Sequence, residues 1–415
     1  MTAGGGSKPV IVVGAGPAGL MAAETLARAG VRVIVRDASP SPARKFLLAG
    51  RGGLNLTHSE PLATFLSRYG EAAARLKPAI EGFPPGALRA WAADLGEETF
   101  IGSSGRVFPK SFKATSLLRA WLRRLDGLGV ALKPRSRFVG FGDRGALRFV
   151  SGEREETVEA AAAIFALGGA SWPRLGSDGG WVEAFRMAGV GVTPLKPANC
   201  GFTVAWSDFV RERFAGTPLK TIALSHGTLR VRGEAVVTAT GLEGGAVYSL
   251  SASLRDAIAA AGCTILAIDF RPDVEESALA ARLGPKRGRS VSTVLRKAGL
   301  TPVAVALMRA AGPMPEDAAG LARRAKHCEI RLVGTAPLAR AISTAGGVAW
   351  SEVDGGFMLI RRPGAFVAGE MIDWEAPTGG YLLQACFATG VAAGRAAARF
   401  VAEAETDLRK SARGR

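Results

Sequence analysis

The chain has 415 residues, of which 48% are hydrophobic and 21% are charged, a balance typical of a soluble globular protein. A chain of this length predicts two or three domains rather than one. It contains no run long and apolar enough to cross a membrane, and its first apolar run lacks the order of a signal peptide. We therefore expect a cytoplasmic protein without a membrane partner.

The cysteines and the net charge narrow the classes of function. None of the four cysteines forms a C-x-x-C pair, so neither a thiol redox pair nor a metal site is indicated. The 53 Lys and Arg against 36 Asp and Glu give a net charge of +17, with denser basic stretches at 106–137 and 282–297. Solvated faces explain such scattered charge most simply, so nucleic acid is not the expected partner, and an RNA-associated protein is kept as an alternative.

The start of the chain has the element order of a dinucleotide-binding βαβ unit. A strand, a G-x-G-x-x-G turn, a helix and a second strand are predicted at 10–13, 14–19, 20–28 and 31–35. Gly14 permits the tight turn, Gly16 lets a pyrophosphate approach the backbone, and Gly19 lets the helix pack closely on the strand. Asp37, just past the second strand, has the position of the carboxylate that binds ribose hydroxyls. Together these residues predict an adenine dinucleotide at the N-terminus of the helix.

The middle of the chain alternates between helical and strand-like segments. Helices are predicted at 61–98, with breaks at Pro78 and Pro84, and at 114–128; strands within 130–158, at 161–167 and within 195–270; and a basic helical region at 275–327. The strand at 161–167 ends in the turn Gly168-Gly169. Because ligands lie at the carboxyl ends of the strands in an open α/β sheet, we expect Gly168 to border the dinucleotide.

The C-terminal region has a second pattern, one that suits a flavin. A strand, an acidic turn, a glycine pair and a long helix are predicted at 365–368, 369–373, 379–380 and 382–402. The carboxylates of Glu370 and Asp373 can bind ribitol hydroxyls. The helix N-terminus at Gly379 and Gly380 can stabilise the negative charge that develops at the N1 and C2=O edge of a flavin on reduction. With the N-terminal unit, this pattern predicts non-covalently bound FAD.

Five segments in order carry a family resemblance. They are G-A-G-P-A-G at 14–19, G-R-G-G-L-N-L-T-H-S-E at 50–60, G-R-V-F-P at 105–109, G-L-E-G-G-A at 241–246 and G-E-M-I-D-W-E-A-P-T-G-G-Y at 369–381. Together they resemble the bacterial family of NAD(P)/FAD-dependent oxidoreductases, also called aminoacetone oxidase-family FAD-binding enzymes, which includes YhiN-like and BaiN-like flavoproteins. The L-T-H-S-E segment is similar to that of a proteobacterial subgroup. Many relatives have R-C-N-x-T in the glycine loop; this chain has Gly53-Leu54-Asn55-Leu56-Thr57, so no role of that cysteine is transferred.

The resemblance implies a fold class and further cofactor residues. The implied class is α/β, with a discontinuous FAD-binding Rossmann-like domain of the glutathione-reductase type at 1–194 and 343–415. A β-barrel-like domain with a small helical subdomain at about 275–327 is inserted at 195–342. The family pattern also places these residues: Arg44 and Lys45 near the phosphates or adenosine, Gly52, Gly53 and Asn55 on the flavin side, Gly369, Glu370 and Asp373 at ribitol, and Gly379 and Gly380 at the pyrimidine edge.

The reaction and its electron donor stay open at this point. No second complete βαβ unit is present, because the glycine spacing in Ala166-Leu167-Gly168-Gly169-Ala170 is wrong for one. NAD(P)H, if it is the donor, would therefore bind transiently at the flavin. We expect an FAD-dependent oxidoreductase acting on a small organic substrate by hydride transfer at flavin N5, either as an oxidase or as an NAD(P)H-dependent reductase. An RNA-associated flavoprotein in tRNA modification and a flavin-binding protein without turnover are the alternatives.

Three residues are candidates for catalysis. His58 follows the glycine loop and could act as an acid or a base, although a structural histidine is the competing interpretation. Arg106 could hold an anionic substrate in bidentate fashion or tie a loop. Tyr381, beside the start of the flavin helix, could donate a hydrogen bond or pack in the core.

Overall fold

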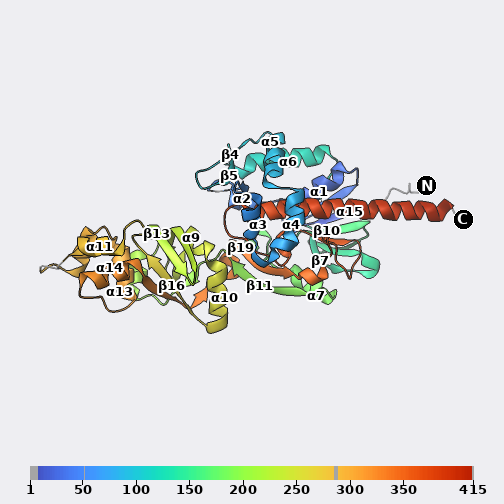
Figure 1. Cartoon of the computed structure of the whole chain (residues 1–415). Helices are drawn as coiled ribbons and strands as arrows, with labels where there is room; N and C mark the ends of the chain where they lie inside the picture. The colour runs from blue at the N-terminus through green and yellow to red at the C-terminus, as the bar shows by residue number, and fades with distance from the viewer. Residues whose placement is uncertain (1–7, 51, 285–287, 414–415) are drawn as a thin grey trace. The chain divides into compact units, whose positions relative to one another are not determined.

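The computed structural model describes residues 8–50, 52–284 and 288–413, which form two compact units (Figure 1). Unit 1 comprises Met1–Lys196 and Ser343–Arg415, and unit 2 comprises Pro197–Ile342. Each unit has its own hydrophobic core. Among the described residues, no helix is both long enough and apolar enough to span a bilayer.

Unit 1 is built on a parallel sheet with the strand order β20-β10-β1-β2-β6. Its strands are β1 (Val10–Val13), β2 (Val33–Arg36), β6 (Ala131–Lys133), β10 (Ala162–Phe165) and β20 (Ala365–Val367). The apolar run of β1 is fully buried between β2 and β10, with Val13 opposite both Arg36 and Phe165. The carboxyl ends of these parallel strands therefore meet at one edge of the sheet, and the predicted α/β class is confirmed.

The helices of unit 1 include the predicted first and last helices. They are α1 (Pro17–Arg28), α2 (Arg44–Ala49), α3 (Leu62–Ser67), α4 (Ala73–Gly82), α5 (Pro85–Asp94), α6 (Ala114–Gly127), α7 (Trp181–Met187) and α15 (Tyr381–Arg413). The long helix α15, red in Figure 1, packs against α1. A Cβ added at Gly390 would lie 2.4 Å from the carbonyl oxygen of Ala18, and one at Gly394 would lie 2.9 Å from Thr25, so glycines allow this close crossing.

A buried carboxylate ties α1 to two other helices. Glu24 of α1 is 2% exposed, and its side chain accepts hydrogen bonds from the indole N–H groups of Trp91 in α5 and Trp121 in α6, at 3.0 and 2.8 Å. Arg28 and Arg124 supply ion pairs to the same carboxylate. Because its charge is paired, Glu24 can remain inside the core while fixing α5 and α6 against α1.

Three smaller sheets complete unit 1, and the first two of them are antiparallel. They are β7 (Arg137–Phe141), β8 (Leu147–Ser151) and β9 (Arg154–Val158); β3 (Thr57–His58), β5 (Arg106–Pro109) and β4 (Thr99–Ile101); and β11 (Val192–Ala198), which crosses the boundary of the unit, with β19 (Ser343–Val348). Turns of 3₁₀ helix lie at 70–72, 143–145, 173–175, 350–352 and 369–371. In the β3-β5 pair, Thr57 lies opposite Val107 and His58 opposite Arg106.

Unit 2 contains an antiparallel sheet with the order β17-β16-β13-β14-β15-β12-β18. Its strands are β12 (Phe202–Thr203), β13 (Pro218–His226), β14 (Leu229–Val237), β15 (Gly241–Glu243), β16 (Thr264–Asp269), β17 (Cys328–Leu332) and β18 (Gly334–Thr335). The two edge strands, β17 and β18, are separated in sequence only by Val333. The sheet must therefore roll until its two edges come together, which gives unit 2 its barrel-like form.

Helices also line unit 2, three of them where only strands were predicted. They are α8 (Asp208–Phe214), α9 (Gly245–Ser249), α10 (Ser251–Ala261), α11 (Glu276–Leu283), α12 (Val291–Lys297), α13 (Pro302–Ala310) and α14 (Ala318–Lys326), with a 3₁₀ turn at 338–340. The last four α-helices match the predicted helical region at 275–327. The strand prediction was wrong at α8, α9 and α10. Val247 and Leu250, for example, are both buried at an interval of three residues, which shares a face in a helix but not in a strand.

The predicted break at Pro78 is also wrong. Pro78 lies inside α4, whereas the break predicted at Pro84 is found, immediately before α5. A proline in a helix removes one backbone hydrogen bond, but α4 is held by its buried side chains Leu76, Ala79 and Ile80. Tertiary packing here overrides the local preference.

Candidate cofactor site

The turn between β1 and α1 has the geometry that G-x-G-x-x-G predicts. Gly14 has a φ of +103°, and a Cβ added there would lie 2.4 Å from the carbonyl oxygen of Ala166. A Cβ added at Gly19 would lie 1.9 Å from the carbonyl oxygen of Gly14, so α1 approaches β1 only because residue 19 has no side chain. At Gly16, by contrast, no described atom lies within 4 Å of an added Cβ. The space before the N-terminus of α1 is thus open to a ligand.

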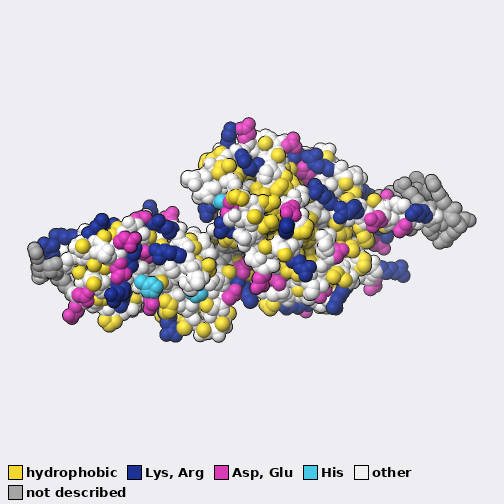
Figure 2. Space-filling model, viewed as in Figure 1, with side chains coloured by type: hydrophobic (Ala, Val, Ile, Leu, Met, Phe, Trp, Pro, Cys, Tyr) yellow, Lys and Arg dark blue, Asp and Glu magenta, His cyan; other side chains and the backbone are white. Residues whose placement is uncertain are grey.

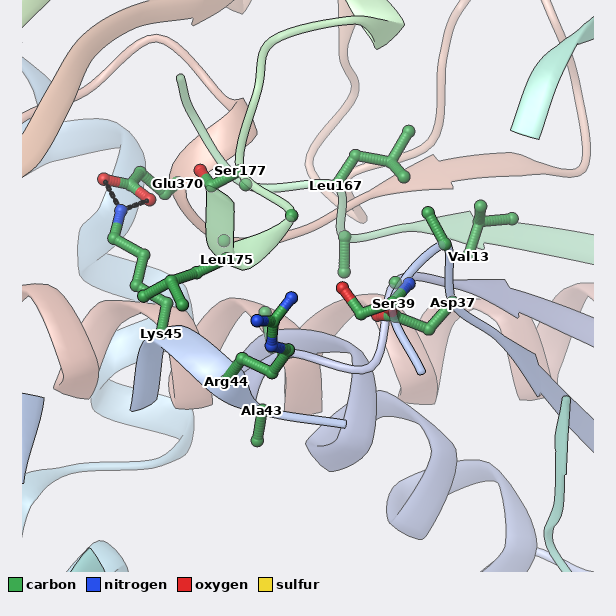
Figure 3. Close-up of a pocket in the computed structure, with 18 of the residues that line it drawn as sticks. Val13, Asp37, Ser39, Ala43, Arg44, Lys45, Leu167, Leu175, Ser177 and Glu370 are labelled. Carbon is green, nitrogen blue, oxygen red and sulfur yellow. Dashed lines mark hydrogen bonds and ion pairs between the residues drawn. The ribbon is translucent and has the colours of Figure 1, made fainter. Parts of the chain in front are cut away.

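A cavity of about 1020 Å³, part of it open to solvent, lies at this turn (Figure 3). The walls come from stretches of unit 1 within 13–46, 136–138, 166–181 and 368–386. The cavity brings together these residues predicted to bind the cofactor: Gly14, Gly16, Asp37, Arg44, Lys45, Gly168, Gly369 and Glu370.

Asp37 joins two loops at the edge of the cavity. Its carboxylate accepts hydrogen bonds from the backbone N–H groups of Ala15, at 2.6 Å, and Ser39, at 2.7 Å. These bonds connect the glycine turn to the loop after β2 and leave Asp37 in the cavity wall. This is the position of a ribose-binding carboxylate relative to a dinucleotide at α1. A contact of Asp37 with ribose stays a prediction.

Lys45 and Glu370, which are far apart in sequence, form an ion pair in the cavity wall. The Lys45 Nζ atom lies 2.8 Å from Oε2 and 3.1 Å from Oε1 of Glu370 (Figure 3). It also donates to Ser171 Oγ at 2.6 Å. Glu370 is 6% exposed and also accepts hydrogen bonds from the backbone N–H groups of Gly169, at 3.3 Å, and Thr344, at 3.0 Å. This pairing makes burial of the carboxylate tolerable and fixes its orientation.

Arg44 differs from its neighbour Lys45. Its guanidinium reaches toward the cavity in Figure 3, and no described residue is recorded as a hydrogen-bond or ion-pair partner for it. A cation of this kind beside the N-terminus of α1 suits an anionic ligand.

Two further observations test whether the cavity fits FAD. The Ser177 hydroxyl oxygen lines the cavity and is buried, and no described group bonds to it, so it has a free hydrogen-bonding capacity. Burial raises the pKa of the Cys386 thiol to about 12, so this wall residue stays neutral. The open backbone at Gly16, the orphaned hydroxyl and the cationic Arg44 fit a dinucleotide with a pyrophosphate.

The residues predicted for the flavin side lie outside the wall of this cavity, around β3 and the start of α15. Gly53 has a φ of +105°, and Gly379 and Gly380 have φ values of +139° and +93°. A Cβ added at Gly380 would lie 2.6 Å from the Cα of Thr57, so the glycine loop and the start of α15 are in direct contact. Asn55 belongs to the same loop, and its Oδ1 atom is buried. Gly52 is exposed, with no described atom within 4 Å of an added Cβ.

Asp373 is placed differently from Glu370. Its Oδ2 atom accepts a hydrogen bond from Thr193 Oγ1 at 2.7 Å, and it is not part of the cavity wall that Glu370 lines. The structure therefore gives Asp373 a bond to the start of β11 within unit 1. Its predicted contact with ribitol stays a prediction.

His58 and Tyr381 meet, as their predicted roles would require, but their polar atoms are engaged. The two rings stack with centroids 5.5 Å apart. Nδ1 of His58 accepts from the backbone N–H of Glu60 at 3.1 Å, so Nε2 carries the proton and donates to the Ser104 carbonyl at 2.9 Å. The Tyr381 hydroxyl donates to Glu60 Oε1 at 2.7 Å. In this arrangement neither side chain offers a free proton, and their role as acid or base stays a prediction.

Arg68 completes this cluster. It makes a bidentate ion pair with Glu60, at 3.0 and 2.7 Å, and its guanidinium lies 6.0 Å from the centroid of the Tyr381 ring. The hydrogen bonds from Arg68 and Tyr381 hold the pKa of the Glu60 carboxyl below its usual value, against the opposing effect of burial. Burial and the neighbouring Glu60 raise the pKa of Tyr381, which therefore stays a neutral phenol.

Arg106 lies at the outer side of the same small sheet. It is exposed on β5 directly opposite His58, and no described residue is recorded as its polar partner. The loop-tying alternative thus has no bond to support it, and substrate binding by Arg106 stays a prediction.

Several residues of the site were missed from the sequence. Ser171, Thr344 and Ser177 surround Glu370 or line the cavity, but isolated Ser and Thr residues carry no pattern. Arg68 follows Glu60 by eight residues, a spacing that matches no motif. The L-T-H-S-E segment, which contains Glu60, was the one signal that could have pointed to this cluster.

Comparison with known proteins decides the family. Residues 8–396 match the family described as HI0933-like protein Rossmann domain. The chain belongs to this family. As a member of the HI0933-like family, which is of the YhiN- and BaiN-like type, the protein is an FAD-dependent oxidoreductase with a Rossmann-type FAD-binding fold.

Two relatives of known activity align with nearly the whole of this HI0933-like chain. The 3-dehydro-bile acid delta(4,6)-reductase of Clostridium scindens is 26% identical over 408 residues, which cover 93% of this chain and 98% of the relative. The ribosomal RNA dihydrouridine synthase of Escherichia coli is 24% identical over 389 residues, which cover 90% of this chain and 94% of the relative.

Solved structures with the same fold include two steroid dehydrogenases. The 3-ketosteroid-delta4-(5alpha)-dehydrogenase of Rhodococcus jostii has a TM-score of 0.52 at 16% identity, covering 96% of this chain and 98% of that one. The 3-ketosteroid delta1-dehydrogenase of Sterolibacterium denitrificans has a TM-score of 0.54 at 13% identity, covering 95% and 99%. At these identities the likeness concerns the fold alone.

Proposed function

We propose that the protein is a reductase that adds hydrogen across a carbon–carbon double bond conjugated to a carbonyl group. The observation that carries this proposal is what the two relatives of known activity have in common. A delta(4,6) double-bond system conjugated to a 3-keto group and the 5,6 double bond of uracil are both enones or enone-like. In such a system, hydride addition at the β-carbon leaves an enolate, which a proton then neutralises at the α-carbon. The family identity supplies the cofactor for this chemistry.

The residues of the cavity suit this role. FAD, when bound and reduced, supplies a hydride at N5. The N-terminus of α1 with Gly16 would hold the pyrophosphate, Asp37 the adenosine ribose and Glu370 the ribitol. Lys45 keeps Glu370 in one orientation through its ion pair. The N-terminus of α15 at Gly380 would stabilise negative charge on the ring edge.

We infer that the electrons come from NADH or NADPH bound transiently at the flavin. The single complete G-x-G-x-x-G unit of the chain is already assigned to FAD. A small organic molecule with a conjugated ketone is the substrate class we favour, and the cytoplasm, where NAD(P)H is available, is the compartment we propose. None of the four cysteines, all of which lie in the described residues, forms a disulfide, which agrees with a reducing compartment.

The second candidate is reduction of a uracil base in RNA. It is favoured by the net charge of +17 and by the activity of the Escherichia coli relative. Figure 2 shows Lys and Arg side chains over much of the visible face of each unit, interspersed with Asp and Glu rather than gathered in one stripe. Binding driven by such charge would weaken steeply as salt rises.

An anaerobic experiment tests the proposal and separates its candidates. Holoprotein is titrated with NADH or NADPH until the flavin absorbance near ~450 nm is bleached, and a 4-en-3-one steroid or a uridine-rich RNA is then added. Return of the absorbance with the steroid supports a small-molecule reductase, and return with RNA alone supports the second candidate. Reoxidation by dioxygen but by neither conjugated acceptor would contradict the proposal and favour an oxidase.

A further inference from the structure

Three buried side-chain oxygens near the start of α15 have no hydrogen-bond partner among the described residues. They are Oγ1 of Thr57, Oδ1 of Asn55 and Oγ1 of Thr378. Thr57 is the clearest case, because the whole residue is 0% exposed. Burying a polar oxygen without a partner costs free energy, so a folded chain keeps such groups where something else satisfies them.

The three oxygens belong to two segments that touch each other. Asn55 lies two residues before Thr57, which is the first residue of β3. A Cβ added at Gly380 would lie within 2.7 Å of the Thr57 N, Cα and C atoms, so this segment presses against the start of α15. Thr378 lies two residues before Gly380 on the opposing segment. The unpartnered groups thus flank one contact.

The N-terminus of α15 also provides free backbone N–H groups beside these three oxygens. An α-helix of 33 residues leaves its first N–H groups without helical partners, and α15 has no acidic residue in its first turn to bind them. Gly379 and Gly380, both with positive φ, carry no side chains that would cover these donors. Hydroxyl and N–H donors therefore lie together with one amide oxygen, which is an acceptor.

We propose that Thr57, Thr378 and Asn55 are the side chains that hydrogen-bond the imide edge of the isoalloxazine ring, beside the N-terminus of α15. An imide has an N–H between two carbonyl groups. The N–H would donate to Asn55 Oδ1, and the carbonyl oxygens would accept from the hydroxyls of Thr57 and Thr378. The inference rests on FAD as the cofactor and not on the substrate proposed above. It adds two threonines, which lie in the segments at 50–60 and 369–381 but were given no role there, to the glycines already assigned to this end of the flavin.

The test replaces each threonine by the isosteric valine and measures the apoprotein and FAD binding separately. For Thr57→Val and Thr378→Val we expect apoprotein that is at least as stable to heat as the wild type, because an unpartnered hydroxyl has been removed. We expect FAD to bind about tenfold more weakly, which corresponds to the loss of one hydrogen bond, and the bound flavin to have a lower reduction potential. Thr57→Ser keeps the hydroxyl and is expected to restore both properties.

Thr389→Val is the matched control. Thr389 is equally buried, but its hydroxyl donates to the Ala385 carbonyl and accepts from the Gly369 N–H, so its loss should destabilise the apoprotein. The proposal is overturned if Thr57→Val and Thr378→Val bind FAD as the wild type does. It is also overturned if weaker binding comes with a destabilised apoprotein and an unchanged potential at saturating FAD, since the hydroxyls would then be structural. Neither readout involves substrate, so failure here leaves the proposed reductase activity untouched.

Discussion

The cluster around Glu60 shows how single residues fix the end of the flavin-side helix. Glu60 receives two bonds from Arg68 and one from Tyr381, the first residue of α15. Tyr69 adds a hydrogen bond from its hydroxyl to the Tyr381 carbonyl at 2.8 Å. Since these bonds hold both the side chain and the backbone of Tyr381, we interpret Glu60 and Arg68 as positioning residues for the start of α15.

Removing the charge of Glu60 should lower stability in a pH-dependent way. We expect Glu60→Gln to lower the free energy of unfolding by about 1–2 kcal/mol at pH 7. This is at the low end for hydrogen bonds to a charged group, because the partner Arg68 is 45% exposed and solvent screens the pair. The folded pKa of Glu60 lies below its usual value, so the stabilisation is present above the unfolded pKa and is lost as pH falls through the folded pKa. Urea unfolding at pH 7 and at pH 4 measures the difference between variant and wild type.

Tyr381→Phe is the control for this experiment. It removes one bond to Glu60 while leaving the ring that stacks on His58, and Arg68 keeps Glu60 ionised. We expect a smaller loss than for Glu60→Gln. An equal deficit of Glu60→Gln at both pH values would contradict the assigned pairing.

At the scale of elements, two glycines of the β1-α1 turn have different roles, one in packing the helix and one in leaving space for a ligand. Gly19 is required for packing, because an added Cβ would overlap the backbone of the turn, whereas Gly16 faces open space. Gly19 is therefore needed for the fold, whereas Gly16 leaves room for a ligand.

This contrast predicts different outcomes for two substitutions of the same size. We expect Gly19→Ala to disrupt the turn and to lower the melting temperature by several degrees or abolish soluble expression, as overpacking of about 1–3 kcal/mol would. We expect Gly16→Ala to melt within a degree or two of the wild-type apoprotein but to bind FAD at least tenfold more weakly. Thermal melts of apoprotein and FAD titrations test both; normal FAD affinity of Gly16→Ala would refute the placement of the pyrophosphate.

The sequence predicted the parts of the fold that depend on local pattern. The glycine turn, the strand at 365–368 and the basic helices at 275–327 follow from spacing, and all three are found. The ion pair of Lys45 with Glu370 joins residues 325 positions apart, and the sequence around either residue does not predict it. The predicted helix break at Pro78 was wrong for the same reason. The packing of buried neighbours keeps α4 continuous, although proline itself disfavours a helix interior. Contacts made through tertiary packing are thus the ones that local spacing does not reveal.

At the scale of the whole molecule, the two units have separate cores and different relations to the chain. Unit 2 is one continuous segment, Pro197–Ile342, whose described residues form a rolled sheet and the seven α-helices α8–α14. Unit 1 needs both ends of the chain, because β20 and α15 complete a sheet and a core that begin at β1.

We therefore expect unit 2 to fold without unit 1. A fragment of residues 197–342 should melt cooperatively by circular dichroism, whereas a fragment of residues 1–196 should not, because it lacks α15, which packs on α1. Full-length protein melted in parallel provides the reference. A non-cooperative melt of the 197–342 fragment would contradict the independence of unit 2.

The close crossing of α15 over α1 has a consequence for biosynthesis. The glycines of α15 that meet Ala18 and Thr25, Gly390 and Gly394, follow these partners in the chain by about 370 residues and are therefore synthesised much later. In the nascent chain, the face of α1 that packs on α15 therefore stays uncovered until α15 has been synthesised. At about 5–20 residues per second, the interval between α1 and α15 lasts tens of seconds, during which protection by a chaperone would matter most.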